Sequence, residues 1–207
     1  MITHDYTIWL VVLEYHPRGR LGNLPAVLEM TPKLAAPHLL MRLLVDYAAV
    51  LSVLHHREPE GARVLCDTWS LQKITHQFLL TRDFRLLLND VDDVSLVIPS
   101  KSRLARCSAG FYTRPELLDP DFLAPEEFSQ GYFDQSVDIY KAPAVAQWIL
   151  EWAGAEGQAL LHDLEPIHQL CKVRLVPRFV TLLSVPSVCL VDPMPATHET
   201  SGIPLTL

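Results

Sequence analysis

The sequence has little of what would place it in several large protein classes. Basic residues number 17 against 24 acidic ones, so the formal net charge is −7 and no basic face is available for a nucleic-acid backbone. The longest aliphatic or aromatic run near the amino end, Ile8 to Leu13, is far shorter than the roughly 20 residues that span a bilayer. We therefore expect no nucleic-acid partner and no membrane span in this segment, and no signal peptide is visible.

Cysteines and phosphate-binding motifs are also scarce. The four cysteines are scattered and form no Cys-x-x-Cys pair, so they define neither a disulfide framework nor a redox compartment. The sequence contains no Gly-x-Ser-x-Gly elbow, no Walker loop and no Gly-x-Gly-x-x-Gly segment. With 49% hydrophobic and 20% charged residues, the chain can nevertheless bury one sizeable core.

Apolar periodicity predicts helices joined by short strands. Between Leu40 and Leu54, apolar residues recur at spacings of three, four and seven, which indicates an amphipathic helix after Thr31-Pro32 with Arg42 and Asp46 on its wetter side. Further helices are predicted at 24–30, in part of 71–80, from Pro143 onward, and at 160–171, where Pro166 would kink or divide the helix. Strands are predicted at 6–15, 64–66 and 84–88. The segment 99–125 is predicted to be a long loop.

Three short motifs stand in the order typical of the back half of a protein kinase. They are Leu65-Cys66-Asp67, Asn89-Asp90-Val91 and Ala124-Pro125-Glu126. Phosphoryl transfer needs one carboxylate to orient the attacking hydroxyl and another to bind magnesium, and each aspartate follows an apolar strand. An aspartate in that place is by itself more often a turn former or helix cap. The combination of Asp67 and Asp90 with the third motif and with Asp138 favours the catalytic interpretation.

Other polar residues near these motifs can be interpreted either as functional or as structural. Gln72 follows Asp67 at the spacing at which an asparagine holds a second metal ion in ordinary protein kinases, although its longer side chain is less well positioned. Lys73 could contact a phosphate, but a lysine in an amphipathic stretch is most often solvated. His55 and His56 lack ligand spacing to other metal-binding residues and are interpreted as helix-end histidines.

The chain resembles the protein O-mannose kinase family, divergent kinases of the secretory pathway. The segments that carry the resemblance are Glu14-Tyr15-His16-Pro17, Gly19, Asn23-Leu24, Leu54-His55-His56, Arg63 to Asp67, Leu79-Leu80-Thr81, Asn89-Asp90, Asp121 to Glu126 and Val137 to Lys141. Cysteine in place of arginine before Asp67 separates this family from ordinary protein kinases. The missing arginine implies that a phosphorylated activation loop does not switch the protein.

The resemblance implies an α+β fold, namely a protein-kinase-like, mainly helical C-lobe with short strands and with the N-lobe largely missing. The implied division is 1–15 as the last N-lobe strand and hinge, 16–172 as the C-lobe, and 173–207 as a divergent, poorly ordered tail. The implied activity is ATP-dependent phosphorylation of the mannose of an O-linked glycan, with ATP and Mg²⁺ as cofactors. A noncatalytic pseudokinase or binding fragment without the ATP-clamping N-lobe is the alternative.

The resemblance also assigns roles to individual residues. The implied roles are catalytic for Asp67, metal-binding for Asp90 and Gln72, adenine-binding through the hinge backbone for Glu14 and His16, and structural for Glu126 and Asp138. The implied partner is an O-mannosyl glycan on a glycoprotein such as dystroglycan. The implied location is the lumenal side of the endoplasmic reticulum, with a membrane anchor that is absent from this chain.

Overall fold

The computed structural model describes residues 14–56, 61–91, 94–97, 105–106, 121–128 and 132–172. Most of the strand predicted at 6–15, most of the loop predicted at 99–125, and the tail predicted at 173–207 lie outside the described residues. The division into N-lobe strand, C-lobe and tail therefore stays a prediction.

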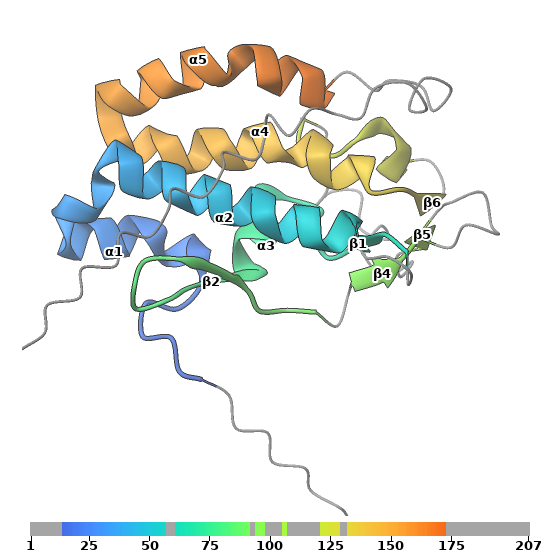
Figure 1. The fold of residues 1–207 in the computed structure, drawn as a ribbon, viewed down its shortest axis with the longest axis horizontal. Helices are drawn as coiled ribbons and strands as arrows, with labels where there is room; N and C mark the ends of the chain where they lie inside the picture. The colour runs from blue at the N-terminus through green and yellow to red at the C-terminus, as the bar shows by residue number, and fades with distance from the viewer. Residues whose placement is uncertain are drawn as a thin grey trace, which may run out of the picture.

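The described part is mainly helical, and its three longest helices lie side by side. They are α2 (Pro37–His55), α4 (Ser136–Leu150) and α5 (Gly154–Lys172), with α4 between the other two (Figure 1). Shorter helical segments are η1 (Leu21–Asn23), α1 (Leu24–Met30), η2 (Pro32–Ala35), α3 (Leu71–His76), η6 (Pro125–Phe128) and η7 (Glu151–Ala153). The helix predicted at 24–30 is confirmed, whereas Thr31-Pro32 opens η2 and α2 begins at Pro37.

Short antiparallel strand pairs complete the described part of the chain. β1 (Arg63–Leu65) pairs with β4 (Val94–Leu96), β2 (Phe78–Leu80) with β3 (Leu86–Leu88), and β5 (Ala105–Arg106) with β6 (Tyr132–Phe133). Figure 1 shows the β2–β3 hairpin lying along α2, and β4, β5 and β6 gathered near the carboxyl end of α2. The strand predicted at 64–66 is confirmed one residue earlier, as β1, and the strand predicted at 84–88 is confirmed in shortened form, as β3, and the two belong to different pairs.

Two proline predictions are corrected by the structure. Pro143 does not open a helix but lies buried inside α4, which begins one and a half to two turns earlier, at Ser136. Pro166 does not divide α5, which also starts earlier than predicted, at Gly154. Close packing sets this geometry, since a Cβ on Gly157 would lie 1.9 Å from the carbonyl oxygen of Leu150. Packing of the α4–α5 pair therefore outweighs the local cost of a proline in a helix.

The core lies between α2, α4 and the β2–β3 hairpin. Its most deeply buried side chains include Leu40, Leu43, Tyr47, Leu51, Phe78, Leu80, Val145 and Ile149. Tyr47 and Phe78 make an edge-on ring contact with centroids 5.3 Å apart. α2 is the one described helix long and apolar enough to cross a membrane, and here it is the central helix of this core.

An ion pair fastens α2 to the β2–β3 hairpin. Asp46 is only 6% exposed, which corrects its predicted place on the wetter side of the helix. Its carboxylate accepts hydrogen bonds from Arg85, with Nη2 at 2.5 Å and Nε at 2.8 Å, and from the Leu86 backbone N–H at 2.9 Å. The hairpin that leads to Asp90 is thereby tied to the core helix.

We predict that Asp46→Ala lowers the free energy of unfolding of the 207-residue chain by about 1–3 kcal/mol, because the buried Leu86 N–H loses its acceptor. Urea unfolding measures this change. Asp83→Ala, at an exposed position in the turn of the same hairpin, is the matched control and should change the free energy little. Equal effects from the two variants would show that the Asp46 carboxylate does not tie the hairpin to α2.

Candidate active site

Asp67 is fixed by the backbone that surrounds it. It follows β1, and the side chain of Asp138 on α4 accepts a hydrogen bond from the Leu65 N–H at 3.3 Å. On the other side of Asp67, the Thr68 hydroxyl donates to the Leu65 carbonyl at 2.9 Å, and the Thr68 N–H donates to the Cys66 carbonyl at the same distance. A tight turn therefore presents Asp67 at the end of the strand.

The two carboxylate oxygens of Asp67 have different surroundings. Oδ2 accepts hydrogen bonds from Lys73 Nζ at 2.7 Å and from Gln77 Nε2 at 3.2 Å. Oδ1 is buried and accepts no hydrogen bond from the described part of the chain. A buried acceptor without a donor lowers the stability of the fold by about 1–3 kcal/mol, and such an atom is often one that takes part in function. One oxygen is thus held in place while the other remains available to a donor that the described residues do not supply.

Gln77 connects the Asp67 turn with the segment that carries Asp90. Its side-chain Nε2 also donates to the Asp67 carbonyl at 3.0 Å. Its own carbonyl accepts hydrogen bonds from the Asn89 N–H at 2.8 Å and from the Asp90 N–H at 3.4 Å. Gln77 is 4% exposed and directly precedes β2, whose partner β3 ends just before Asn89. The two aspartates therefore belong to one network although β1 and β3 are not paired.

Asp90 and Gln77 each keep a side-chain oxygen that could bind a cation. Asp90 is partly exposed, and its carboxylate makes no hydrogen bond or ion pair with the residues that the structure describes. Because Gln77 Nε2 donates to Asp67, the Gln77 amide oxygen is the atom left to bind a cation. The described residues contain no group of three or more His, Cys, Asp or Glu side chains around one point, but Mg²⁺ commonly takes only one or two carboxylates together with phosphates and water.

The short helix α3 brings Lys73, but not Gln72, to Asp67. The Ser70 hydroxyl caps this helix by accepting from the Lys73 N–H at 3.2 Å, and the Lys73 side chain runs back to Asp67, partly exposed. Lys73 is therefore paired rather than simply solvated. Gln72, predicted to bind metal together with Asp90, is exposed and lines a shallow hollow with His76 and Trp148, so the structure does not bring it into the network that joins Asp67 and Asp90. The amide beside Asp67 is that of Gln77.

Burial lowers the pKa of His76 at the end of α3, and the nearby charges of Arg20 and Lys73 act in the same direction. The neutral imidazole is consequently favoured next to this cationic side of the site.

Behind the site, Asp138 is completely buried in the first turn of α4. Its Oδ2, which binds the Leu65 N–H, also lies 3.1 Å from Nε2 of His55, the last residue of α2. Burial and the Asp138 charge raise the pKa of Tyr47 well above its usual value, so the phenol stays protonated. The carboxylate of Asp138 thus joins α2, α4 and the strand that ends at Asp67.

A second buried carboxylate ties the Ala124-Pro125-Glu126 motif to the site. It belongs to Glu127, whose Oε2 accepts from the Ala124 N–H at 2.9 Å and whose Oε1 lies 2.5 Å from Lys141 Nζ. Lys141 is completely buried and also donates to the Thr68 hydroxyl at 2.9 Å. Burial raises the pKa of Glu127, although Lys141 and the Ala124 N–H oppose the shift. Glu126, the residue predicted to be structural, is less buried than Glu127.

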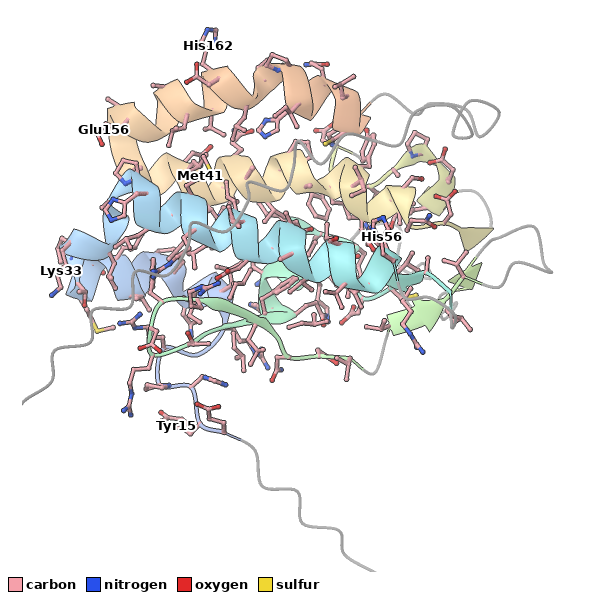
Figure 2. All side chains as sticks on the ribbon, in the orientation of Figure 1. Tyr15, Lys33, Met41, His56, Glu156 and His162 are labelled. Atoms are coloured by element: carbon pink, nitrogen blue, oxygen red, sulfur yellow. The ribbon has the colours of Figure 1, made fainter. Side chains whose placement is uncertain are left out.

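The residues that follow the predicted hinge segment lie against strand β2 of the hairpin. Arg20 forms a bridge with Leu79 of β2, and the Gly19 carbonyl accepts from the Leu80 N–H at 2.8 Å. Gly19 has a φ of +67° and closes a turn by donating its N–H to the His16 carbonyl at 3.0 Å. Figure 2 shows Tyr15 pointing away from the helices, and its side chain is 83% exposed. Glu14 and His16 precede this contact with β2 in the chain, and neither forms a hydrogen bond with the described residues of the network around Asp67; the His16 carbonyl is bonded within its own turn, to the Gly19 N–H.

Sequence comparisons show which known proteins are similar to this chain. No family model matches the chain. Protein O-mannose kinases of Homo sapiens and Macaca fascicularis are each 33% identical to it over 171 residues, and that of Xenopus laevis is 31% identical over 172 residues. This chain matches part of a protein O-mannose kinase. The matches cover 78% of the chain, which spans about half the length of these relatives, namely 47–48%.

Sequence reasoning missed three members of the candidate site. Gln77 carries a signal in its position, because it directly precedes one hairpin strand and so lies opposite Asn89, which directly follows the other. Glu127 and Lys141 stand next to residues that had been singled out, but no local pattern shows that they meet. Their pairing depends on the packing of η6 against α4.

Proposed function

We propose that this chain forms the acceptor-side half of an ATP-dependent kinase that phosphorylates the mannose of an O-linked glycan. One observation carries the proposal. One carboxylate oxygen of Asp67 is held by Lys73 and Gln77, and the other is buried without a donor among the described residues, while Gln77 ties Asp90 to the same network. The partial likeness to protein O-mannose kinases supplies the substrate class.

In the proposed reaction, Asp67 Oδ1 accepts a hydrogen bond from the attacking mannose hydroxyl. As the hydroxyl oxygen bonds to the γ-phosphorus of ATP, the bond to the bridging oxygen breaks, ADP leaves, and the proton passes to Asp67. Lys73 and Gln77 fix the carboxylate through Oδ2, so that Oδ1 is presented in one orientation. The chain's contribution is positioning, which is most of what phosphoryl transfer requires of a protein.

Asp90 and the amide oxygen of Gln77 would hold Mg²⁺ in this proposal. The ion, when bound, neutralises charge on the β- and γ-phosphates. The backbone from Glu14 to His16 would meet adenine, as the resemblance implies; the residues directly after it, Gly19 and Arg20, contact strand β2 of the hairpin that leads to Asp90. Asp138 and Glu127 would brace the site from α4 and η6, and Glu126 would have a structural role near them.

The proposed setting follows from the resemblance alone. It comprises an O-mannosyl glycoprotein such as dystroglycan as substrate and the lumen of the endoplasmic reticulum as the location.

A chimera with the human relative tests the proposed reaction. In it, the segment of human protein O-mannose kinase that matches this chain is replaced by the corresponding residues of this chain, so the remaining half of the relative's length is supplied. We expect ATP-dependent phosphorylation of the mannose in an O-mannosyl glycopeptide, detected by mass spectrometry. A folded chimera that binds Mg-ATP but transfers no phosphate would favour the alternative of a noncatalytic binding protein.

Two glutamine variants of the chimera test the assignment of the metal site. Gln77→Leu removes the amide that lies against Asp67, so we expect the Mg²⁺ concentration for half-maximal rate to rise about 10–100-fold. Gln72→Leu is the matched control, since Gln72 is exposed on α3, and it should leave the Mg²⁺ dependence unchanged. A shift with Gln72→Leu alone would restore the role predicted for Gln72 and exclude Gln77 as the ligand.

A further inference from the structure

We propose that Lys141 is a positioning residue for Asp67, which holds the turn after Asp67 through the Thr68 hydroxyl and makes that turn depend on the docking of η6. Lys141 lies on α4, and its side chain is completely buried. The proposed transfer of phosphate gives this charge no role of its own. The inference rests on the proposed function for the role of Asp67, whereas the contacts of Lys141 can be tested without any activity.

One face of α4 holds the backbone on both sides of Asp67. Asp138 and Lys141 stand three residues apart on this helix, a spacing that makes their side chains neighbours on its surface. Before Asp67, the Asp138 carboxylate accepts a hydrogen bond from the Leu65 N–H at 3.3 Å. After Asp67, Lys141 Nζ donates to the Thr68 hydroxyl at 2.9 Å. The same helix therefore fixes the strand that leads to Asp67 and the turn that follows it.

Lys141 sets the direction in which the Thr68 hydroxyl donates. An ammonium group can only donate, so the hydroxyl oxygen accepts from Lys141 and its own proton is left for another acceptor. That acceptor is the Leu65 carbonyl at 2.9 Å, across the turn that contains Asp67. A hydrogen bond with a charged donor is roughly twice as strong as a neutral one, and it polarises the next bond in the chain. Lys141 thereby strengthens the bond that closes the turn around Asp67.

The second partner of Lys141 is Glu127 of η6. Glu127 Oε1 lies 2.5 Å from Lys141 Nζ, and both side chains are completely buried. The other oxygen, Oε2, accepts from the Ala124 N–H at 2.9 Å, so the carboxylate is fixed by its own segment. Burial disfavours the charged form of a lysine that has no anionic partner. Lys141 can therefore present a charged donor to Thr68 only while η6 is docked against α4.

Threonine variants of the chimera test the role of the hydroxyl. Thr68→Val keeps the shape of the side chain but removes the hydroxyl, so we expect kcat to fall about 100-fold with the KM for ATP unchanged, because a small displacement of a catalytic group costs that much. Thr68→Ser keeps the hydroxyl and should retain most of kcat.

Thr75→Val is the matched control. Thr75 is also buried, and its hydroxyl also donates to the carbonyl three residues earlier, that of Gln72, but no lysine among the described residues donates to it. This variant should leave kcat unchanged. Full kcat in Thr68→Val, or equal losses in Thr68→Val and Thr75→Val, would refute the positioning role.

The combined variant Lys141→Met with Glu127→Gln separates the positioning role of the lysine from the stability of its ion pair. It leaves no buried charge unpaired, so the fold should persist, but the Thr68 hydroxyl loses its donor. We expect kcat to fall about 10–100-fold with the KM for ATP unchanged. Adding Thr68→Val should make the enzyme no slower than Thr68→Val alone, since all these changes act through one hydroxyl. Unchanged kcat in the folded combined variant, or additive losses, would overturn the proposal.

Hydrogen exchange keeps the proposal testable if the chimera transfers no phosphate at all. In the 207-residue chain, the combined variant should speed exchange of the Leu65 and Thr68 amides, which are hydrogen-bonded on either side of Asp67, while Thr75→Val should not. Unchanged exchange of both amides in the combined variant would refute the hold of Lys141 on the turn. Faster exchange together with an inactive chimera would support that hold and argue against the proposed function alone.

Discussion

Asp67→Asn should lower kcat of the chimera by about 10²–10⁴-fold, because asparagine has the shape of aspartate but cannot take the proton of the attacking hydroxyl. The KM for ATP should change little, since the proposed contact of Asp67 is with the acceptor sugar. The side chain fits the same space, so the fold should persist. Rate measurements at varied ATP, with circular dichroism as a check on folding, separate these effects.

Asp83→Asn is the matched control for this variant. It makes the same chemical change at an exposed turn position of the β2–β3 hairpin, and it should leave kcat unchanged. Full phosphate transfer by the Asp67→Asn chimera would show that Asp67 does not take part in the reaction. It would also contradict the proposal that the buried oxygen of Asp67 accepts a hydrogen bond from the attacking hydroxyl.

Lys141→Met should destabilise the 207-residue chain by about 3–5 kcal/mol, because it leaves the buried carboxylate of Glu127 without its cation. Lys141 is completely buried and contacts both Glu127 and the Thr68 hydroxyl, so two hydrogen bonds are also lost. Urea unfolding at neutral pH measures the loss. Lys33→Met is the control, since Lys33 is exposed at the edge of the molecule (Figure 2), and it should change stability little.

The double variant Lys141→Met with Glu127→Gln should recover much of the stability, because no buried charge is then left unpaired. In Lys141→Met alone, burial still raises the pKa of Glu127, and the cation that opposes this shift is gone. The folded state then holds its proton to higher pH than the unfolded state does, so stability should fall as pH rises from the unfolded to the folded pKa. A double variant as unstable as the single one would show that the ion pair is not the cause of the loss.

The sequence predicted the elements whose signals are local. The apolar spacing around Leu40 to Leu54 and the apolar runs that end near Asp67 and Asp90 depend on residues close together in the chain, and the structure has α2, β1 and β3 there. The prolines misled for the same reason. Pro143 has a strong local preference for the first helical turn, but the buried contacts of α4 extend the helix on both sides of it.

The contacts between distant segments could not be predicted from local pattern. Thr68 and Lys141 are separated by 73 residues and meet only because α4 packs behind the Asp67 turn. Spacing from Asp67 singles out Gln72, but that rule holds only for a loop of fixed length. Here α3 lies between Asp67 and β2, and Gln77, the residue directly before β2, brings its amide to the aspartate.

Titration calorimetry of Mg-ATP into the chimera tests most directly whether Asp67 and Asp90 divide one phosphotransfer site between them. Asp90→Asn should weaken Mg-dependent ATP binding about tenfold or more, because it removes the only carboxylate proposed to hold the ion. Asp67→Asn should bind Mg-ATP as the unmodified chimera does. Equal affinity in all three proteins, or a loss confined to Asp67→Asn, would contradict the assignment of Asp90 to the metal and Asp67 to the acceptor hydroxyl.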